Sequence, residues 1–144
     1  MVNTPFAPDE REIVVALQAL RYRLLDVYDP AAFDGLRVSQ LRVIHGVPRG
    51  GVSVTELAER LGMTKQACGQ FVNGLVTSGH LTTRAAADDR RLRLIDRTPA
   101  GERLMKVQHQ HFLEVEAALA DDVGPERYRT FRAVLDELAF GERT

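Results

Sequence analysis

Residues 53–79 read SVTELAERLGMTKQACGQFVNGLVTSG, and this stretch decides the fold. Ser53 and Glu56 form a capping box, in which the hydroxyl and the carboxylate each satisfy a free backbone N–H at the start of a helix. Gly62 suits the left-handed residue that ends a helix, and Thr64 can cap the helix that follows. The stretch therefore predicts two short helices joined by a tight turn, which is a helix-turn-helix arrangement.

The second of these helices, expected to end near Ser78, has two different faces. Its apolar residues can all face a core, and they are Ala67, Cys68, Phe71, Val72 and Leu75. The other side carries short or amide-bearing side chains, and its residues are Thr64, Lys65, Gln66, Gly69, Gln70 and Asn73. Amides can hydrogen-bond adenine in the major groove, and lysine can reach guanine or phosphate. Gly69 would let the helix approach closely. We expect this face to contact DNA, and an ordinary solvated helix face is the alternative.

Beyond this helix the pattern changes to two short β-prone runs, residues 81–84 and 92–96, around a polar loop. Such runs around a tight charged loop predict a hairpin. The loop ends in Asp89, Arg90 and Arg91, and narrow minor grooves attract arginine. Asp89 can brace an arginine through a bidentate pair, although aspartate is also common in plain turns. We expect a wing whose DNA contacts come from Arg84, Asp89, Arg90 and Arg91.

Apolar stripes on both sides of this centre predict further helices. One stripe covers residues 13–27 and is stopped by Asp29-Pro30, and a shorter helix covers 38–47 with Leu41 and Ile44 inward. A long helix starts at Thr98-Pro99, and Gly124-Pro125 separates it from a last one. The stripe residues are Ile13, Leu17, Leu20, Leu24 and Val27, then Met105, Phe112 and Leu119, then Tyr128, Phe131, Leu135 and Leu138. The fold class expected is mainly α with a small β-hairpin.

The net charge of −1 hides an uneven distribution, because residues 60–106 carry +5 and the rest of the chain −6. A basic middle suits DNA contact, since phosphate neutralisation is local, although solvated helix faces alone can give the same unevenness. The length of 144 residues with 44% apolar residues suggests one globular domain. The chain has no long apolar run and no signal-peptide layout at its start. We therefore expect a cytoplasmic location.

The sequence gives little support for redox sensing, metal binding or catalysis. Cys68 could sense oxidation, but on the inward face of its helix a thiol usually acts as a small hydrophobe. His109 and His111 would point about 200° apart on a helix, which is poor chelation geometry. Neither they nor His45 and His80 lie beside a cysteine-rich cluster. There is no Gly-x-Ser-x-Gly motif, phosphate loop or paired catalytic carboxylates. We expect no enzyme activity, no cofactor and no metal.

Three segments, in this order and spacing, resemble signatures of the MarR family of bacterial transcription regulators. Residues 35–44, GLRVSQLRVI, resemble its second helix, and 57–67, LAERLGMTKQA, its helix-turn-helix. Residues 89–91, followed after six residues by 98–101, resemble its wing and the start of the next helix. Arg97 departs from the family pattern, which usually has leucine there, at a position that should seat the wing against the domain.

The resemblance implies a single domain over residues 1–144, with a winged helix-turn-helix at about 35–99 and dimerisation helices at about 10–34 and 100–140. It implies a homodimer on double-stranded DNA with a pseudo-palindromic operator, most often a repressor released by a small, often aromatic, anion. The ligand pocket of the family lies between the dimerisation helices and the DNA-binding part. From their place near the first two helices, the candidates are Arg21, Tyr22, Tyr28 and His45. The alternative is a dimeric winged-helix module that binds a protein instead of specific DNA. An activator or a ligand-independent regulator is a narrower possibility.

Overall fold

The computed structural model describes residues 7–25 and 28–141, and the chain divides into two compact units. Unit 1 comprises Met1–Val27 with His109–Thr144, and unit 2 comprises Tyr28–Gln108. The elements in chain order are η1 (Pro8–Glu10), α1 (Ile13–Leu25), η2 (Pro30–Phe33), α2 (Val38–Gly46), α3 (Val54–Leu61), α4 (Lys65–Thr77), β1 (Leu81–Ala85), β2 (Arg93–Arg97), α5 (Pro99–Val123) and α6 (Pro125–Phe140). The predicted fold class, mainly helical with one hairpin, is confirmed.

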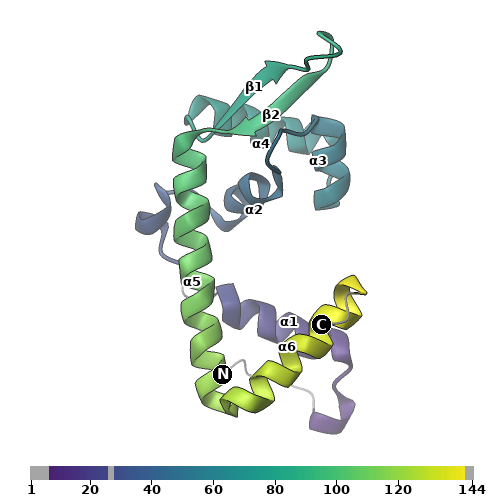
Figure 1. Ribbon diagram of the computed structural model, residues 1–144, viewed down its shortest axis with the longest axis vertical. Helices are drawn as coiled ribbons and strands as arrows, with labels where there is room; N and C mark the ends of the chain where they lie inside the picture. Colours follow the sequence, from purple (N-terminus) through teal and green to yellow (C-terminus); the bar gives the residue numbers. More distant parts are fainter. Residues whose placement is uncertain (1–6, 26–27, 142–144) are drawn as a thin grey trace. The chain divides into compact units, whose positions relative to one another are not determined.

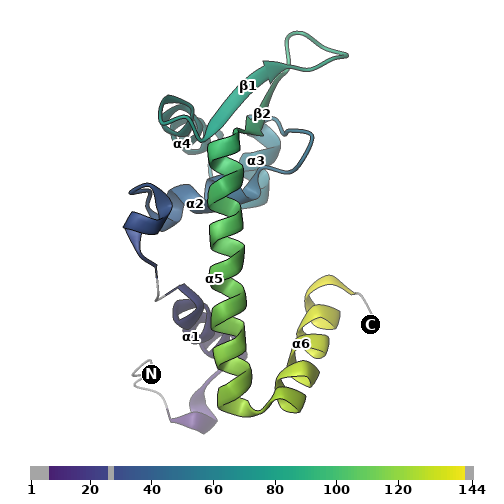
Figure 2. The ribbon, with the colours of Figure 1, turned by 60° about the vertical axis from the view of Figure 1, so that its left-hand side comes forward.

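Unit 2 packs α2, α3, α4 and the first turns of α5 around one apolar core (Figure 1). Leu41 and Ile44, which we expected to face inward, are both buried in it. Strands β1 and β2 pair antiparallel, with Leu81 opposite Arg97. Figure 2 shows the loop of this hairpin extending beyond the helices of the unit. Unit 2 thus has the architecture of a helix-turn-helix with a wing.

The helix ends around the turn follow the sequence signals. Ser53 Oγ accepts a hydrogen bond from the backbone N–H of Glu56 at 3.2 Å, which is one half of the predicted capping box. Gly62 takes the left-handed conformation, with φ 63° and ψ 37°, at the end of α3. Thr64 Oγ1 accepts from the Ala67 N–H at 3.1 Å and so caps α4. The predicted starts and ends of α3 and α4 are confirmed.

The segment after the first helix contains an element that the sequence did not predict. Helix α1 is described over Ile13–Leu25, and Val27, which we placed at the end of its stripe, lies outside the described residues. Asp29 caps a short 3-10 helix that we did not predict, since its Oδ1 accepts from the Ala31 N–H at 3.0 Å. Pro30 at the first position suits such a start because its φ is already close to helical.

The start of α5 is fastened to the turn between α4 and β1. Thr98 Oγ1 accepts from the Gly101 N–H at 3.2 Å and donates to the Gly79 carbonyl at 2.5 Å. The Thr98 N–H donates to the His80 carbonyl at 3.2 Å. A Cβ on Gly101 would lie 2.2 Å from that same oxygen. Glycine is therefore required at 101 by the close approach of two backbones.

A buried histidine joins the same turn to the segment before α2. The side chain of His80 is 6% exposed, with Nδ1 2.8 Å from Ser78 Oγ and Nε2 2.9 Å from Asp34 Oδ2. Arg103 on α5 also donates to Asp34, at 2.6 Å. The hydrogen bond to His80, with that to Arg103 next, lowers the pKa of Asp34 below its usual range. His80 thus serves the packing of unit 2.

Unit 1 leaves much apolar surface uncovered. Neither α1 nor α6 has a buried residue, and Ile13 and Leu138 are 73% and 76% exposed. Tyr128 on α6 donates to Glu116 on α5 at 2.9 Å, and burial, with this bond, raises the pKa of Tyr128 to about 12.

None of the described helices combines the length and apolarity needed to cross a membrane.

We expect Gly101→Ala to destabilise unit 2 by about 1–3 kcal/mol, because the added methyl group overlaps a fixed backbone carbonyl. The measurement is urea-induced unfolding followed by circular dichroism. Gly74→Ala is the matched control: a Cβ there meets nothing within 4 Å, and alanine in a helix interior is favoured over glycine by about 0.5–1 kcal/mol. Equal stability of the two variants would contradict the close approach described here.

Candidate nucleic-acid interface

The two faces predicted for α4 are present in the structure. Cys68, Val72 and Leu75 are buried on the core side. The side chains predicted to contact DNA are exposed, apart from the half-buried Gly69, and these are Thr64, Lys65, Gln66, Gln70 and Asn73. The exposed face therefore offers amides, a hydroxyl and one ammonium group, which can donate to and accept from base edges.

Gly69 has no explanation within the chain. A Cβ at this position would meet nothing within 4 Å, and φ lies in the range that any residue adopts. Glycine inside a helix costs about 0.5–1 kcal/mol relative to alanine. The open space over Gly69 is what a helix needs in order to approach another molecule closely.

The amino-terminal end of α4 is suited to an anion. Thr64 Oγ1 is engaged as the cap acceptor, which leaves its own O–H able to donate. Lys65 is exposed in the first turn. The positive end of the helix dipole lies at the same place and favours phosphate.

The hairpin loop presents two arginines. Arg90 and Arg91 are exposed, and no ion pair involves either of them in the part of the chain that the structure describes. The carboxylate of Asp89 accepts from the backbone N–H of Arg91 at 3.0 Å. Asp89 thus shapes the turn, as aspartate often does, in place of the bidentate arginine pair that we expected. Both guanidinium groups remain available to a ligand.

Arg84 fastens the hairpin to the linker between α2 and α3. Its Nε donates to Asp96 Oδ2 at 2.6 Å and its Nη2 to the Gly50 carbonyl at 2.8 Å. A Cβ on Gly51, whose φ is +87°, would lie 2.9 Å from the Asp96 carboxylate and 3.1 Å from this guanidinium. The side chain of Arg84 is also about half exposed, so its contact with DNA stays a prediction.

Arg97, the departure from the family pattern, is held by α2. Its Nε donates to the Ile44 carbonyl at 3.0 Å and its Nη2 to the His45 carbonyl at 3.1 Å. Polar contacts with the end of a helix thus replace the apolar seat that a leucine would provide at the base of the wing.

The four predicted ligand contacts are divided between the two units. Arg21 and Tyr22 are exposed on α1 in unit 1, whereas Tyr28 and His45 belong to unit 2. The ring of Tyr28 stacks on Phe33, with centroids 5.5 Å apart, and its buried hydroxyl has no hydrogen-bond partner among the described residues. Burial, with Asp29 nearby, raises the pKa of Tyr28. Their role in ligand binding stays a prediction.

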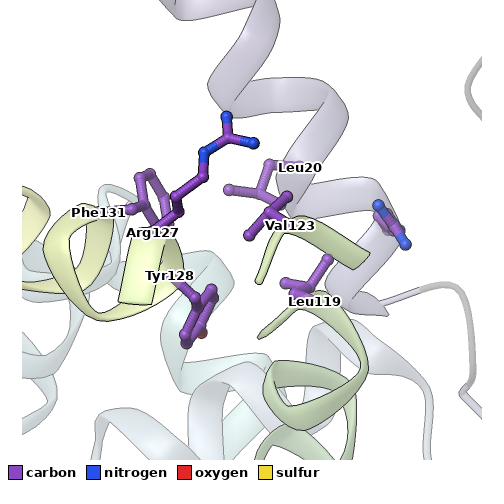
Figure 3. A pocket seen from close by; sticks show the side chains of 7 residues that line it. Leu20, Leu119, Val123, Arg127, Tyr128 and Phe131 are labelled. Atoms are coloured by element: carbon purple, nitrogen blue, oxygen red, sulfur yellow. The ribbon is translucent and has the colours of Figure 1, made fainter. Parts of the chain in front are cut away.

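A pocket that the sequence did not reveal lies within unit 1 (Figure 3). Its volume is about 310 Å³, and its lining residues are Leu20, Arg23, Leu119, Val123, Arg127, Tyr128 and Phe131. Figure 3 shows Leu20, Leu119 and Val123 facing the rings of Tyr128 and Phe131. The lining residues Leu20, Leu119, Tyr128 and Phe131 belong to the apolar stripes predicted from the sequence. The spacing of a stripe shows which side of a helix is apolar, but it does not show whether two helices leave a space between them. The pocket can hold an apolar group.

The structure also bears on the cysteine and the histidines. Cys68 is fully buried, and burial raises the pKa of its thiol, which disfavours the reactive thiolate. Over residues 7–25 and 28–141, no group of three or more His, Cys, Asp or Glu side chains is placed to hold a metal ion.

Comparisons with known proteins agree with this geometry. The family model described as MarR family matches residues 34–92, which include α2, α3, α4 and β1. No curated protein sequence matches the chain significantly.

Three solved structures share the fold of the whole chain. A MarR-family transcriptional regulator from Rhodococcus sp. RHA1 has 20% identity and a TM-score of 0.70, with 98% of this chain and 100% of that chain covered. CouR from Rhodococcus jostii RHA1, bound to p-coumaroyl-CoA, has 21% identity and a TM-score of 0.67, with 92% and 95% covered. NadR in complex with 4-hydroxyphenylacetate has 20% identity and a TM-score of 0.69, with 96% and 100% covered. The family model thus matches the helix-turn-helix and the first strand of the wing, and these three solved structures share the fold.

Proposed function

We propose that this protein is a transcription regulator that binds specific DNA as a homodimer. The observation that carries the proposal is the exposed face of α4, which offers amides and an uncrowded glycine and belongs to the same unit as a wing with two exposed arginines. A helix of this kind fits the major groove, and an arginine on a wing fits the adjacent minor groove.

Each part of the interface has its own role. Lys65, Gln66, Gln70 and Asn73 read base edges in the major groove, and Thr64 contacts phosphate or a base edge. Such contacts each contribute about 1–3 kcal/mol of discrimination between bases. Arg90 or Arg91 enters the minor groove, with the turn shaped by Asp89 directing the loop.

A second copy of the chain covers the apolar faces of unit 1. Contiguous apolar surface of this kind is uncommon on monomers and marks association. The large apolar side chains exposed on α1 and α6 are Ile13, Val14, Leu17, Tyr22, Phe131, Val134, Leu138 and Phe140. A two-fold dimer presents two copies of α4, so the operator is pseudo-palindromic, with half-sites about one helical turn of DNA apart or a multiple of it.

The regulator acts as a repressor in the bacterial cytoplasm, and a small molecule releases it from DNA. The complexes of NadR with 4-hydroxyphenylacetate and of CouR with p-coumaroyl-CoA support an effector that contains an aromatic ring. Arg21, Tyr22, Tyr28 and His45 are the contacts we propose. The pocket of unit 1 is a separate candidate place, since its volume of about 310 Å³ suits a small ligand.

The deciding experiment is a gel shift with DNA from the protein's own promoter region and unrelated DNA as competitor. We expect a specific shift and a footprint of two inverted half-sites. Binding that is blind to sequence, or no binding, would overturn the proposal and favour the protein-interaction module, for which a partner would then be sought.

We expect Gly69→Ala to keep or raise the stability of the protein while lowering its affinity for the operator. Alanine is the better helix former, but its methyl group occupies the space in which the DNA backbone or a base edge approaches. The measurements are thermal unfolding and fluorescence anisotropy with operator DNA. Unchanged affinity would exclude a close approach at Gly69, and Gly74→Ala serves as the control for glycine-to-alanine stabilisation in the same helix.

We expect Arg91→Ala to weaken DNA binding and to flatten its salt dependence, because each phosphate contact contributes about 0.9 to the slope of log K against log salt. The slope is measured between low and physiological salt. Arg103→Gln is the control, since Arg103 pairs with Asp34 inside unit 2. A slope identical to that of the wild type would remove Arg91 from the interface.

We expect Leu138→Glu to shift the protein from dimer to monomer in analytical ultracentrifugation, because a carboxylate would have to be buried against the partner's apolar face. Leu92→Glu is the matched control, as Leu92 is an exposed leucine on the hairpin in unit 2. A variant at 138 that sediments like the wild type would place the dimer contact elsewhere.

A further inference from the structure

Arg97 lies where several elements of unit 2 meet. It is the last residue of β2 and pairs with Leu81, the first residue of β1, which follows the end of α4 by a short turn. Helix α5 begins two residues later, at Pro99. A change in the direction of this side chain therefore affects the root of the wing.

The side chain of Arg97 reaches across to the carboxyl-terminal end of α2. It donates to the carbonyls of Ile44 and His45 at 3.0 and 3.1 Å. The last carbonyls of a helix have no partner within the helix, and the helix dipole makes this end negative. The Ile44 carbonyl also accepts from the backbone N–H of Val47, at 3.2 Å. A guanidinium group is thus well matched to the site, and its two directional bonds fix an orientation that a leucine side chain would leave free.

The remaining guanidinium nitrogen of Arg97 also has a partner. Its Nη1 lies 3.6 Å from Glu102 Oε1 on the first turn of α5. The Arg97 side chain is only 17% exposed. Arg97 therefore joins β2 to both α2 and α5, and it is placed to hold the protein together instead of touching DNA itself.

Two further attachments of the hairpin reach the linker between α2 and α3. Val52 forms an isolated bridge with Ile95, with backbone bonds of 3.1 and 2.8 Å in the two directions. Arg84 binds the carbonyl of Gly50. Arg97 adds a contact with the body of α2, which packs against α3 and α4.

We propose that Arg97 is a positioning residue for DNA binding. By capping α2 it fixes the root of the hairpin, so that the wing arginine, Arg91 in the test below, enters the minor groove while α4 lies in the major groove. This inference rests on the proposed function, and it predicts that Arg97 acts on DNA affinity through the wing arginines.

A double-mutant cycle tests whether Arg97 acts on DNA affinity through a wing arginine. The variants are Arg97→Met, which keeps the apolar stem but removes every donor, Arg91→Ala, and the two combined. We expect each single change to lower operator affinity roughly tenfold, and the double variant to bind within about twofold of Arg91→Ala. Arg42→Met is the matched control, because Arg42 caps the Leu61 carbonyl of α3 at 2.6 Å, away from the wing. We expect Arg42→Met to change the operator affinity by the same factor in the wild type and in Arg91→Ala.

The other outcomes overturn the proposal. Full additivity of Arg97→Met with Arg91→Ala would mean a separate contact, and an unchanged affinity with a lower melting temperature would mean a purely structural role. Hydrogen exchange of the hairpin amides in the free protein gives a readout without DNA. We expect faster exchange at Ile95 and along β2 in Arg97→Met, and unchanged rates would contradict the inference. If the wild type itself binds no specific DNA, the proposed function fails, and the exchange rates alone decide whether Arg97 holds the wing.

Discussion

The close approach of the Gly101 backbone to the carbonyl of His80 is the constraint on which unit 2 depends. It brings the start of α5 against the turn that follows α4, and Thr98 secures it from both sides. The hairpin begins immediately after this turn and ends immediately before α5. Helix α4, the wing and α5 are therefore held at one point, and the direction of each is set by the contacts of a few atoms.

The charges of the basic middle segment divide between two tasks. Arg84, Arg97 and Arg103 are paired with carboxylates or carbonyls of unit 2, whereas Lys65, Arg90 and Arg91 are exposed. Two of the carboxylate partners, Asp96 and Glu102, belong to the same segment, so their pairs are already counted in its net charge of +5. In a nearly neutral protein, exposed cations on α4 and on the hairpin loop can still attract an anion locally, while the paired arginines maintain the fold.

The sequence predicted the local features well. Ser53, Gly62 and Thr64 act on backbone groups within a few residues of themselves, so the helix ends they produce were visible in the chain. Contacts between distant segments were not visible. Arg97 meets a carbonyl 53 residues away and His80 a carboxylate 46 residues away, and no spacing rule connects such positions. The pocket of unit 1 was missed for the same reason, since it depends on how α1, α5 and α6 meet.

The bridge between Val52 and Ile95 has a consequence for the behaviour of the hairpin as a sheet edge. Exposed edges of small sheets can pair with another chain and so start aggregation. Val52 uses both backbone bonds at the middle of β2, which covers that edge with a residue from the linker. The opposite strand, β1, has only five residues and carries Arg84, and short charged edges pair poorly. The wing is thereby protected against forming strands with its neighbours while its loop stays exposed.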